Sequence, residues 1–363
     1  MADMIREASG DIDARIGKID TPLRMVVAHE SDVQSKKDSI VKQLYNVEKS
    51  THFAETVVTQ DELGYFKGVA EGGGAPNDTY GETSKKIIEH DQLMSEMTIT
   101  KMALDDSNYE LTSGMRTKAE NFTRSAYKTR NRLAQMALIK ATGTTVTDCG
   151  VTLDLTTGDG KPLFSTEHKY GSEKLHGTGT QSNWFRYSRA SDTDDLTQTM
   201  IDEALAEAVE RIRTMKSENG DILGYTADTI IIPANARKLE QFIRRSLGSE
   251  HDPASANNAI NTQYGNWNLI ILPSWEIVKT GNIATQDFPF LVMSSEMNEN
   301  LQGNMFLDRS SLDIESWVDK HTRNYIMNGY MRFGIGFGSY KHILRFDIQG
   351  KSSTAVDATA VTL

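Results

Sequence analysis

The sequence contains little cysteine and little proline. One cysteine, Cys149, occurs among 363 residues, which excludes an internal disulfide framework and a metal cage built from cysteines. Its 7 prolines are too few for a rigid proline-rich linker. Stability must therefore come from burial within the chain or from contacts with other chains, and we expect a reducing compartment during assembly.

Long apolar runs are missing as well. No stretch of about eighteen consecutive apolar residues occurs, so the sequence predicts no membrane-spanning helix. Residues 1–7 carry acidic side chains and lack an apolar segment, so we expect no secretory signal here. The hydrophobic fraction of 38% and the charged fraction of 25% are those of an ordinary soluble chain with one large domain or two moderate ones.

Positive charge is in deficit. The formal net charge of −11 argues against a protein whose main function is nucleic-acid binding, although it allows a locally basic face. One such face is predicted within residues 110–142, where basic residues outnumber acidic ones. The simpler interpretation of this segment is a solvated helix face; the sharper one is a surface facing packaged DNA, with Arg124, Lys128 and Arg132 as its candidates.

The first hundred residues predict an arm followed by a hairpin. Residues 1–50 are interpreted as an N-terminal arm in which Gly17 and Pro22 cut short a helical stripe formed by Ile12, Ile16 and Ile19. Residues 51–98 contain two strand-like segments that flank a glycine-rich stretch. This pattern predicts a long projecting loop that buries little within its own chain.

A long helix is predicted for residues 110–142, with caps among residues 105–108 and a C-terminal Gly143. Apolar residues recur at intervals of three, four or seven and form one buried stripe. At 1.5 Å per residue, the predicted rod measures roughly 45–50 Å. Such a helix is longer than a compact domain needs.

The remainder of the chain predicts an α+β fold. Residues 143–190 are rich in Gly, Thr and Ser and are interpreted as irregular structure with short strands. A strand–helix–strand succession defines a domain over residues 192–310. Further strands are expected in residues 311–350, and residues 351–363 are interpreted as a loosely held tail.

Several motifs carry a resemblance that covers residues 50–347. The most specific is Asp159-Gly-Lys-Pro-Leu-Phe-Ser-Thr-Glu-His168; others are residues 97–106, the strand–proline units 226–233 and 265–273, and the segment Arg332-Phe-Gly-Ile-Gly-Phe-Gly338. In this order they resemble the major capsid (head) proteins of tailed bacteriophages, which have the Hong Kong 97-type fold. The head-subunit family of Mu-like prophages is similar.

The resemblance implies an architecture and a function. The chain would consist of the N-terminal arm, the extended loop, a spine helix at 110–142, a peripheral domain (99–191 with closing strands at 311–350) and an axial domain (192–310). It would assemble with copies of itself into hexamers and pentamers of an icosahedral head, in the virion, after assembly in the host cytoplasm. Expected partners are portal, scaffolding and decoration proteins and double-stranded DNA bound without sequence specificity. We expect scaffolding to be a separate protein.

Candidate intersubunit contacts follow from the same interpretation. Charged residues of the extended loop would pair with a neighbouring subunit and set its register: Glu71, Asp78, Glu82, Lys85 and Lys86. The segment between the axial strands is expected nearest the ring axis, through Asn257, Asn258 and Asn261.

Sites for chemistry are weakly indicated. Residues 334–338 (Gly-Ile-Gly-Phe-Gly) precede a strand rather than a helix, so glycines that allow close strand packing explain them better than nucleotide binding does. His168 and His176 could ligate a metal in a hydrolase, but their spacing fits no ligand pair and structural histidines are favoured. We therefore expect no enzyme and no cofactor. Rival interpretations are an encapsulin-like nanocompartment shell, a metal-dependent hydrolase and a phage tail component.

Overall fold

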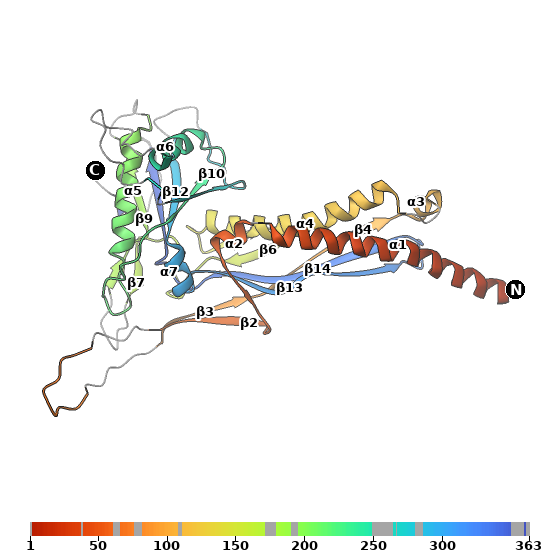
Figure 1. The fold of residues 1–363 in the computed structure, drawn as a ribbon, viewed down its shortest axis with the longest axis horizontal. Helices are drawn as coiled ribbons and strands as arrows, with labels where there is room; N and C mark the ends of the chain where they lie inside the picture. Colours follow the sequence, from red (N-terminus) through yellow and green to blue (C-terminus); the bar gives the residue numbers. More distant parts are fainter. Residues whose placement is uncertain are drawn as a thin grey trace.

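The computed structural model describes residues 2–37, 39–60, 66–75, 82–107, 111–170, 179–189, 195–248, 264–265, 267–279, 286–349 and 359–360. For residues 2–16, 59–60, 82–83, 188 and 359–360 it describes the backbone alone. The described chain forms an elongated half and a second half built on a wider sheet (Figure 1).

The elongated half is a four-stranded sheet covered by two long helices. The strand order is β1 (Asn46–Lys49), β13 (Asn304–Val318), β14 (Tyr325–Phe337) and β4 (Asp91–Ile99). Helices α4 (Ser113–Ile139) and α1 (Ala2–Lys36) run side by side along this sheet (Figure 1). The buried residues Met115 of α4, Leu23 of α1 and Tyr325 of β14 belong to one apolar cluster, so both helices lie on the same sheet face.

Helix α4 confirms the predicted spine helix, with slightly different ends. Thr112 is its N-cap, and its side chain accepts a hydrogen bond from the amide of Met115. The predicted caps are wrong: Asp105 and Asp106 end a short separate helix, α3 (Lys101–Asp106), and Ser107 is its C-cap, while Asn108 lies outside the described residues. At 1.5 Å per residue, the 27 residues of α4 make a rod of about 40 Å.

Helix α1 corrects the prediction that Gly17 and Pro22 cut a helix short. The helix continues through both residues to Lys36. An internal proline costs about 3 kcal/mol, but each fully buried large aliphatic side chain contributes roughly 1.5–3 kcal/mol. Ile19 and Leu23 are buried beside it, and Tyr325 Oη donates a hydrogen bond of 2.7 Å to Asp20. Tertiary burial outweighs the local penalty.

The second half is a six-stranded mixed sheet. Its order is β11 (Asn268–Leu272), β10 (Thr229–Pro233), β12 (Phe288–Met293), β15 (Ile343–Gln349), β9 (Trp184–Ser188) and β16 (Thr359–Ala360). Strands β10 and β12 are buried along their whole length, as expected for strands covered on both faces. Helices α5 (Gln198–Arg213) and α6 (Arg237–Gly248) pack at this sheet.

Strand pairing corrects three predicted boundaries. Strand β15 pairs with β12 and β9, so residues 343–349 belong to the six-stranded sheet rather than to the closing strands of a peripheral domain. Strand β9 joins the same sheet, although residues 99–191 were assigned elsewhere. Strand β13 begins at Asn304, inside the predicted axial domain. Within the predicted loose tail, residues 359–360 pair with β9.

The remaining elements are short. They are α2 (Ile40–Leu44), β2 (Ala54–Gln60), β3 (Glu82–Glu89), β5 (Thr145–Asp148), β6 (Val151–Asp154), β7 (His168–Tyr170), β8 (Gly179–Gln181) and α7 (Ser295–Asn300). The five short strands from β5 to β9 agree with the prediction for residues 143–190.

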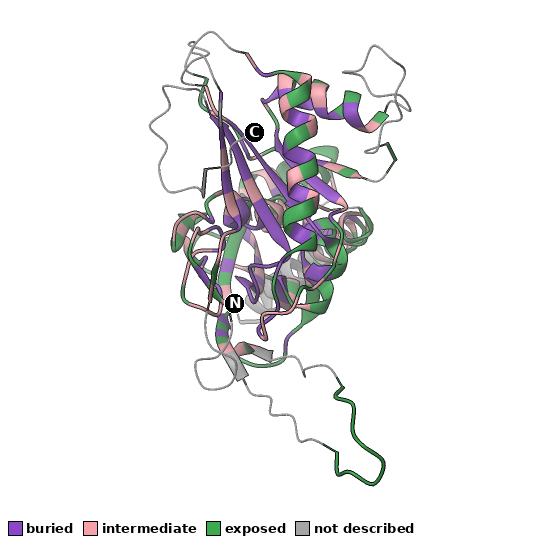
Figure 2. Cartoon of the chain, turned by 90° about the vertical axis from the view of Figure 1, so that its left-hand side faces the viewer, coloured by how far each residue is buried: buried purple, intermediate pink, exposed green. Residues whose placement is uncertain are grey.

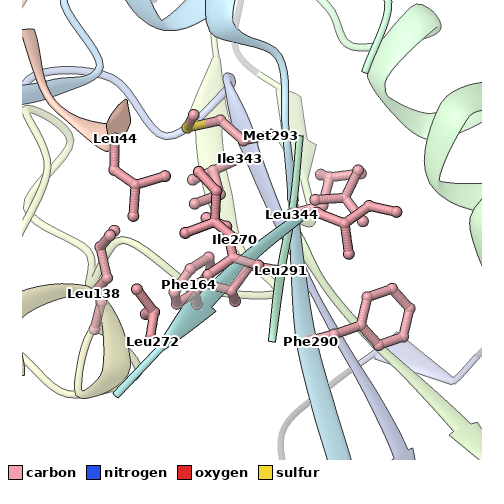
Figure 3. Close-up of a cluster of buried hydrophobic side chains, with 14 of the residues drawn as sticks. Leu44, Leu138, Phe164, Ile270, Leu272, Phe290, Leu291, Met293, Ile343 and Leu344 are labelled. Atoms are coloured by element: carbon pink, nitrogen blue, oxygen red, sulfur yellow. The ribbon is translucent and has the colours of Figure 1, made fainter. Parts of the chain in front are cut away.

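One continuous apolar core joins the two halves. Leu44 of α2, Leu138 of α4 and Phe164 pack toward Ile270 and Leu291 of the six-stranded sheet (Figure 3). The same cluster extends into the four-stranded sheet through buried phenylalanines of β13 and β14. The C-terminal end of the spine helix is therefore embedded where the halves meet.

Candidate intersubunit surfaces

The β2–β3 hairpin is anchored at its base and exposed at its tip. Val57 and Ile88 are buried with Met305 and Leu307 of β13. Residues 66–75 are all exposed, and Phe66 is fully so. The exposed segment projects away from the rest of the described chain (Figure 2). The tip therefore buries nothing within its own chain, as predicted for this loop.

Two glycines of β14 form the seat of the hairpin. A Cβ on Gly334 would lie 2.7 Å from the carbonyl oxygen of Glu89, and one on Gly336 would lie 2.7 Å from Cγ1 of Ile88. A side chain at Gly334 would clash with the β3 backbone, and one at Gly336 would displace the side chain of Ile88 or β3 itself. The structure thus confirms that these glycines serve close strand packing, and the strand β15 that follows leaves no helix N-terminus for a phosphate.

Lys86 is committed within its own chain. The residue is 6% exposed, and its Nζ lies 2.5 Å from Asp154 Oδ2 and 2.7 Å from Thr156 Oγ1. Burial alone would raise the pKa of Asp154, but the hydrogen bonds from Lys86 and Thr156 hold it below its ordinary value. The prediction that Lys86 pairs with a neighbouring subunit is wrong, because strand β3 turns this side chain inward.

The other predicted contact residues are either exposed or have side chains outside the described part of the chain. Glu71 and Lys85 are exposed. Glu82 begins β3, but its side chain lies outside the described residues. Asp78, Asn257, Asn258 and Asn261 also lie outside them.

The second face of the four-stranded sheet has large exposed side chains. Met94 is 57% exposed and Trp317 is 43% exposed, on the face opposite α1 and α4. Cross-strand pairing extends this surface into two rows across β13, β14 and β4. One row consists of Trp317, Ile326 and Thr98, and the other of Asp313, Tyr330 and Met94. We call these six residues the open sheet face.

The basic residues of α4 are largely neutralised. Arg124 Nε lies 2.7 Å from Glu30 Oε1 of α1, and Arg132 Nε lies 2.7 Å from Asp148 Oδ2. These hydrogen bonds raise the pKa of both guanidinium groups above the ordinary value. Lys128 is exposed and forms no ion pair with a described residue. Of the three predicted DNA-facing residues, Lys128 alone presents an uncompensated charge among the residues described.

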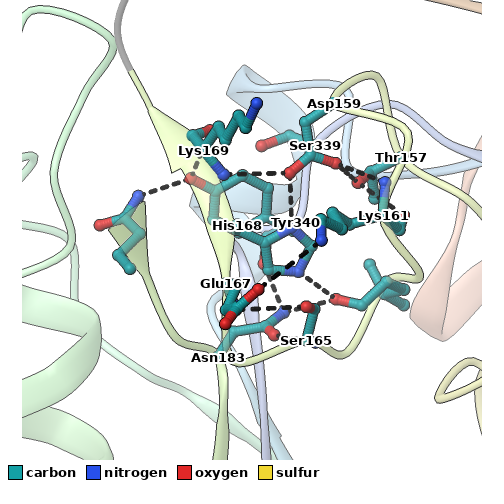
Figure 4. A network of polar contacts seen from close by, with 12 residues as sticks. Thr157, Asp159, Lys161, Ser165, Glu167, His168, Lys169, Asn183, Ser339 and Tyr340 are labelled. Carbon is teal, nitrogen blue, oxygen red and sulfur yellow. Dashed lines mark hydrogen bonds and ion pairs between the residues drawn. The ribbon is translucent and has the colours of Figure 1, made fainter. Parts of the chain in front are cut away.

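His168 is structural, as favoured. Its side chain is completely buried; Nδ1 lies 2.8 Å from Asp159 Oδ2, and Nε2 lies 3.0 Å from the carbonyl oxygen of Leu163 (Figure 4). Both nitrogens are occupied, so neither can bind a metal or activate a nucleophile. His176 lies outside the described residues. The hydrolase interpretation loses its principal residue.

No group of three or more metal-binding side chains comes together within the described ranges. A helix long and apolar enough to cross a membrane is likewise absent from the part of the chain that the structure describes.

Two surface residues were missed by sequence reasoning. Phe66 and Trp317 were not singled out, although both are large and exposed. For Phe66, its place beside the glycine-rich stretch that begins at residue 71 is the signal that could have identified it. Which strand face Trp317 occupies follows only from the pairing of β13.

No family model matches the sequence, and no curated protein matches it. Solved structures do match. A chain of the capsid of the cyanophage P-SCSP1u is similar with a TM-score of 0.51 and 15% identity, over 90% of this chain and 89% of that one. A chain of the capsid of Ralstonia phage GP4 is similar with a TM-score of 0.50 and 11% identity, over 86% of this chain and 87% of that one. The predicted α+β fold of the Hong Kong 97 type is confirmed by these matches.

Proposed function

We propose that this chain is the major capsid protein of a tailed bacteriophage, a subunit that assembles with its own copies into an icosahedral head. The observation that carries this proposal is a fold matched over nine-tenths of the chain to a phage capsid chain, combined with a hairpin whose tip buries nothing in its own molecule. A tip of this kind gains stability only against another chain.

The tip is the first surface proposed to contact a neighbour. Phe66 and Val69 are exposed on a segment whose base is fixed to β13 and β14. Exposed apolar residues on a projecting element are typical of interaction sites. Glu71 and Lys85 would contribute register and orientation more than affinity, and the same role is proposed for Asp78 and Glu82 from the sequence.

The open sheet face is the second surface. Met94 and Trp317 are large apolar side chains with no element of the described chain above them. We infer that the tip of one subunit packs on the open sheet face of the next, head to tail. Such contacts close into rings of five and six by rotation. Each subunit would then bury more than about 2,000 Å², the range of obligate assemblies.

Finer parts of the proposal rest on the resemblance. They are the placement of Asn257, Asn258 and Asn261 near the ring axis, the portal, scaffolding and decoration partners, and assembly in the host cytoplasm before residence in the virion. Contact with packaged double-stranded DNA is supported by Lys128 on the exposed face of α4, and Arg124 and Arg132 would add less because both are paired.

Electron microscopy of the purified full-length chain tests the function. Closed shells are expected, either from the chain alone or with its scaffolding protein. Tubes would indicate a tail component, and shells that enclose a protein cargo instead of DNA would indicate a nanocompartment. A chain that stays monomeric under all these conditions would contradict the proposal.

Disulfide trapping tests the proposed contact directly. The lone Cys149 is replaced by serine, and Val69→Cys is combined with Trp317→Cys; the expected product is a ladder of chains linked by disulfides. The matched control combines Val69→Cys with Val278→Cys, since Val278 is 82% exposed and lies outside both surfaces. Equal cross-linking in the two pairs would refute the contact.

A further inference from the structure

The segment with the most specific sequence motif folds around a buried histidine. The ring of His168 stacks on the ring of Tyr340, with centroids 3.7 Å apart and an interplanar angle of 3°. Tyr340 lies in the turn that connects β14 to β15. This turn leads from the four-stranded sheet into the six-stranded sheet, so the histidine packs against a joint between the two halves.

Hydrogen-bond geometry determines the protonation of His168. The carbonyl oxygen of Leu163 can only accept, so Nε2 must carry a hydrogen. Nδ1 faces the carboxylate of Asp159, which already accepts hydrogen bonds from the hydroxyl of Thr157 and the amides of Lys161 and Lys169. Nδ1 must therefore also carry a hydrogen, provided that Asp159 is ionised.

Asp159 is ionised for a physical reason. Burial alone would raise the pKa of Asp159, but the hydrogen bond and charge of His168, followed by the bonds from Thr157 and Lys161, hold it below its ordinary value. An ionised carboxylate only accepts. With Asp159 ionised, both ring nitrogens of the completely buried His168 face atoms that only accept hydrogen bonds.

The joint itself is buried and polar. Ser339, Tyr340, Lys341 and His342 are each at most 5% exposed. Tyr340 Oη accepts a hydrogen bond of 2.8 Å from Gln181 and donates one of 3.2 Å to the carbonyl of Lys169. Burial raises the pKa of Tyr340, so the phenol stays neutral. Its ring is held by the histidine stack and its hydroxyl by the β7–β8 hairpin (Figure 4).

Of the charged groups near His168, only Asp159 pairs with it. Lys161 and Glu167 pair with each other at 3.8 Å on the exposed side, and Lys341 pairs with Glu218 on the other side of the joint. Lys216 lies over the ring of Tyr170, 5.4 Å from its centroid. The charge of His168 is thus balanced by Asp159 alone among the described residues.

We propose that protonated His168 is a pH-dependent clamp that holds the 155–165 loop and the β7–β8 hairpin against the joint between the two sheets. Loss of either ring proton leaves a lone pair about 3 Å from an oxygen that only accepts, which is repulsive. The clamp opens as pH rises through the loss of this proton. The rigidity of the joint, and with it the relative orientation of the two sheets, depends on one buried charge.

Nitrogen-15 NMR of the unassembled full-length chain, labelled at histidine, tests the charge. Both ring nitrogens of His168 are expected to carry hydrogens near neutral pH, with slowly exchanging N–H signals. In the Asp159→Asn variant the counter-charge is lost, and His168 is expected to become neutral under the same conditions. A neutral His168 in the unaltered chain would overturn the proposal.

Hydrogen exchange measures the coupling to the joint. As pH is raised from weakly acidic to alkaline, backbone protection at residues 339–342 is expected to fall at least tenfold after correction for intrinsic exchange. In the His168→Gln variant protection should be low and independent of pH; the matched control His29→Gln, at an exposed position of α1, should behave like the unaltered chain. Unchanged protection in Asp159→Asn, or a pH dependence that survives in His168→Gln, would refute the clamp.

Discussion

The two halves of the molecule gain their stability in different ways. In the six-stranded sheet, β10 and β12 are buried on both faces, and the rings of Phe185 and Phe290 each stack on the ring of Phe346. In the elongated half, one sheet face is covered by helices, while the other exposes Met94 and Trp317 and the hairpin tip exposes Phe66. The six-stranded half therefore buries most of its apolar surface within the chain, whereas the elongated half leaves large apolar side chains exposed.

Deleting residues 68–80 is the strongest test of this difference. We expect a folded, soluble chain that no longer forms closed shells, because the deletion removes most of the exposed tip and leaves the buried base around Val57 and Ile88 intact. Circular dichroism checks the fold, and electron microscopy checks assembly. Shells of normal size would refute the role given to the arm.

Two phenylalanines sharpen the comparison. Phe290→Ala opens a cavity in the fully buried core and is expected to lower the free energy of unfolding by about 3–5 kcal/mol. Phe66→Ala removes a fully exposed ring and is expected to change it by less than about 0.5 kcal/mol, while reducing shell yield. Denaturant titrations compare the stabilities. A large loss of stability in Phe66→Ala would contradict the independence of the tip.

Acid should weaken the joint through His342. Burial lowers the pKa of His342 to about 3, whereas an unfolded histidine titrates near about 6.5. The unfolded state therefore binds this proton first, and stability is lost as pH falls from about 6.5 toward about 3, by at most about 1.4 kcal/mol per pH unit. Unfolding of the unaltered chain is compared with His342→Gln over that range. Identical slopes for both would show that His342 does not titrate as stated.

The seat of the hairpin can be tested with a matched glycine pair. Gly336→Ala places a Cβ 2.7 Å from the side chain of Ile88, so this side chain or β3 must shift, and a loss of about 1–3 kcal/mol is expected. Gly68→Ala in the tip meets nothing within 4 Å and should change stability by less than about 0.5 kcal/mol. Thermal unfolding of the two variants decides this. Equal losses of stability in the two variants would contradict the close packing of β3 on Gly336.

The smallest effect is expected on DNA retention. Replacing Arg124, Lys128 and Arg132 together by Gln should reduce the DNA retained in shells without preventing assembly. Lys128→Gln alone should produce most of that reduction, because the two arginines are paired with Glu30 and Asp148. Retained DNA is quantified at several salt concentrations, since phosphate contacts are salt-dependent. Unchanged retention in the triple variant would contradict the contact between this face of α4 and DNA.

Much of the fold could be predicted because its signals are local. The apolar stripe of the spine helix, the apolar strands 229–233 and 268–272 and the glycine-rich loop each follow from short-range pattern. The order of motifs then predicted the fold that the capsid structures share. The surface residues were harder, since exposure of Phe66 and burial of Lys86 depend on how β2 and β3 sit on β14.

By itself, the sequence determined the helices and strands of strong periodicity, the absence of disulfides and the role of the glycines at 334 and 336. Tertiary structure alone decided that α1 continues through Pro22, that β15 joins the six-stranded sheet, and that His168 is buried against Asp159. Each of these depends on residues distant in the chain. Burial free energy and long-range pairing depend on residues that are far apart in the sequence, so no local pattern records them.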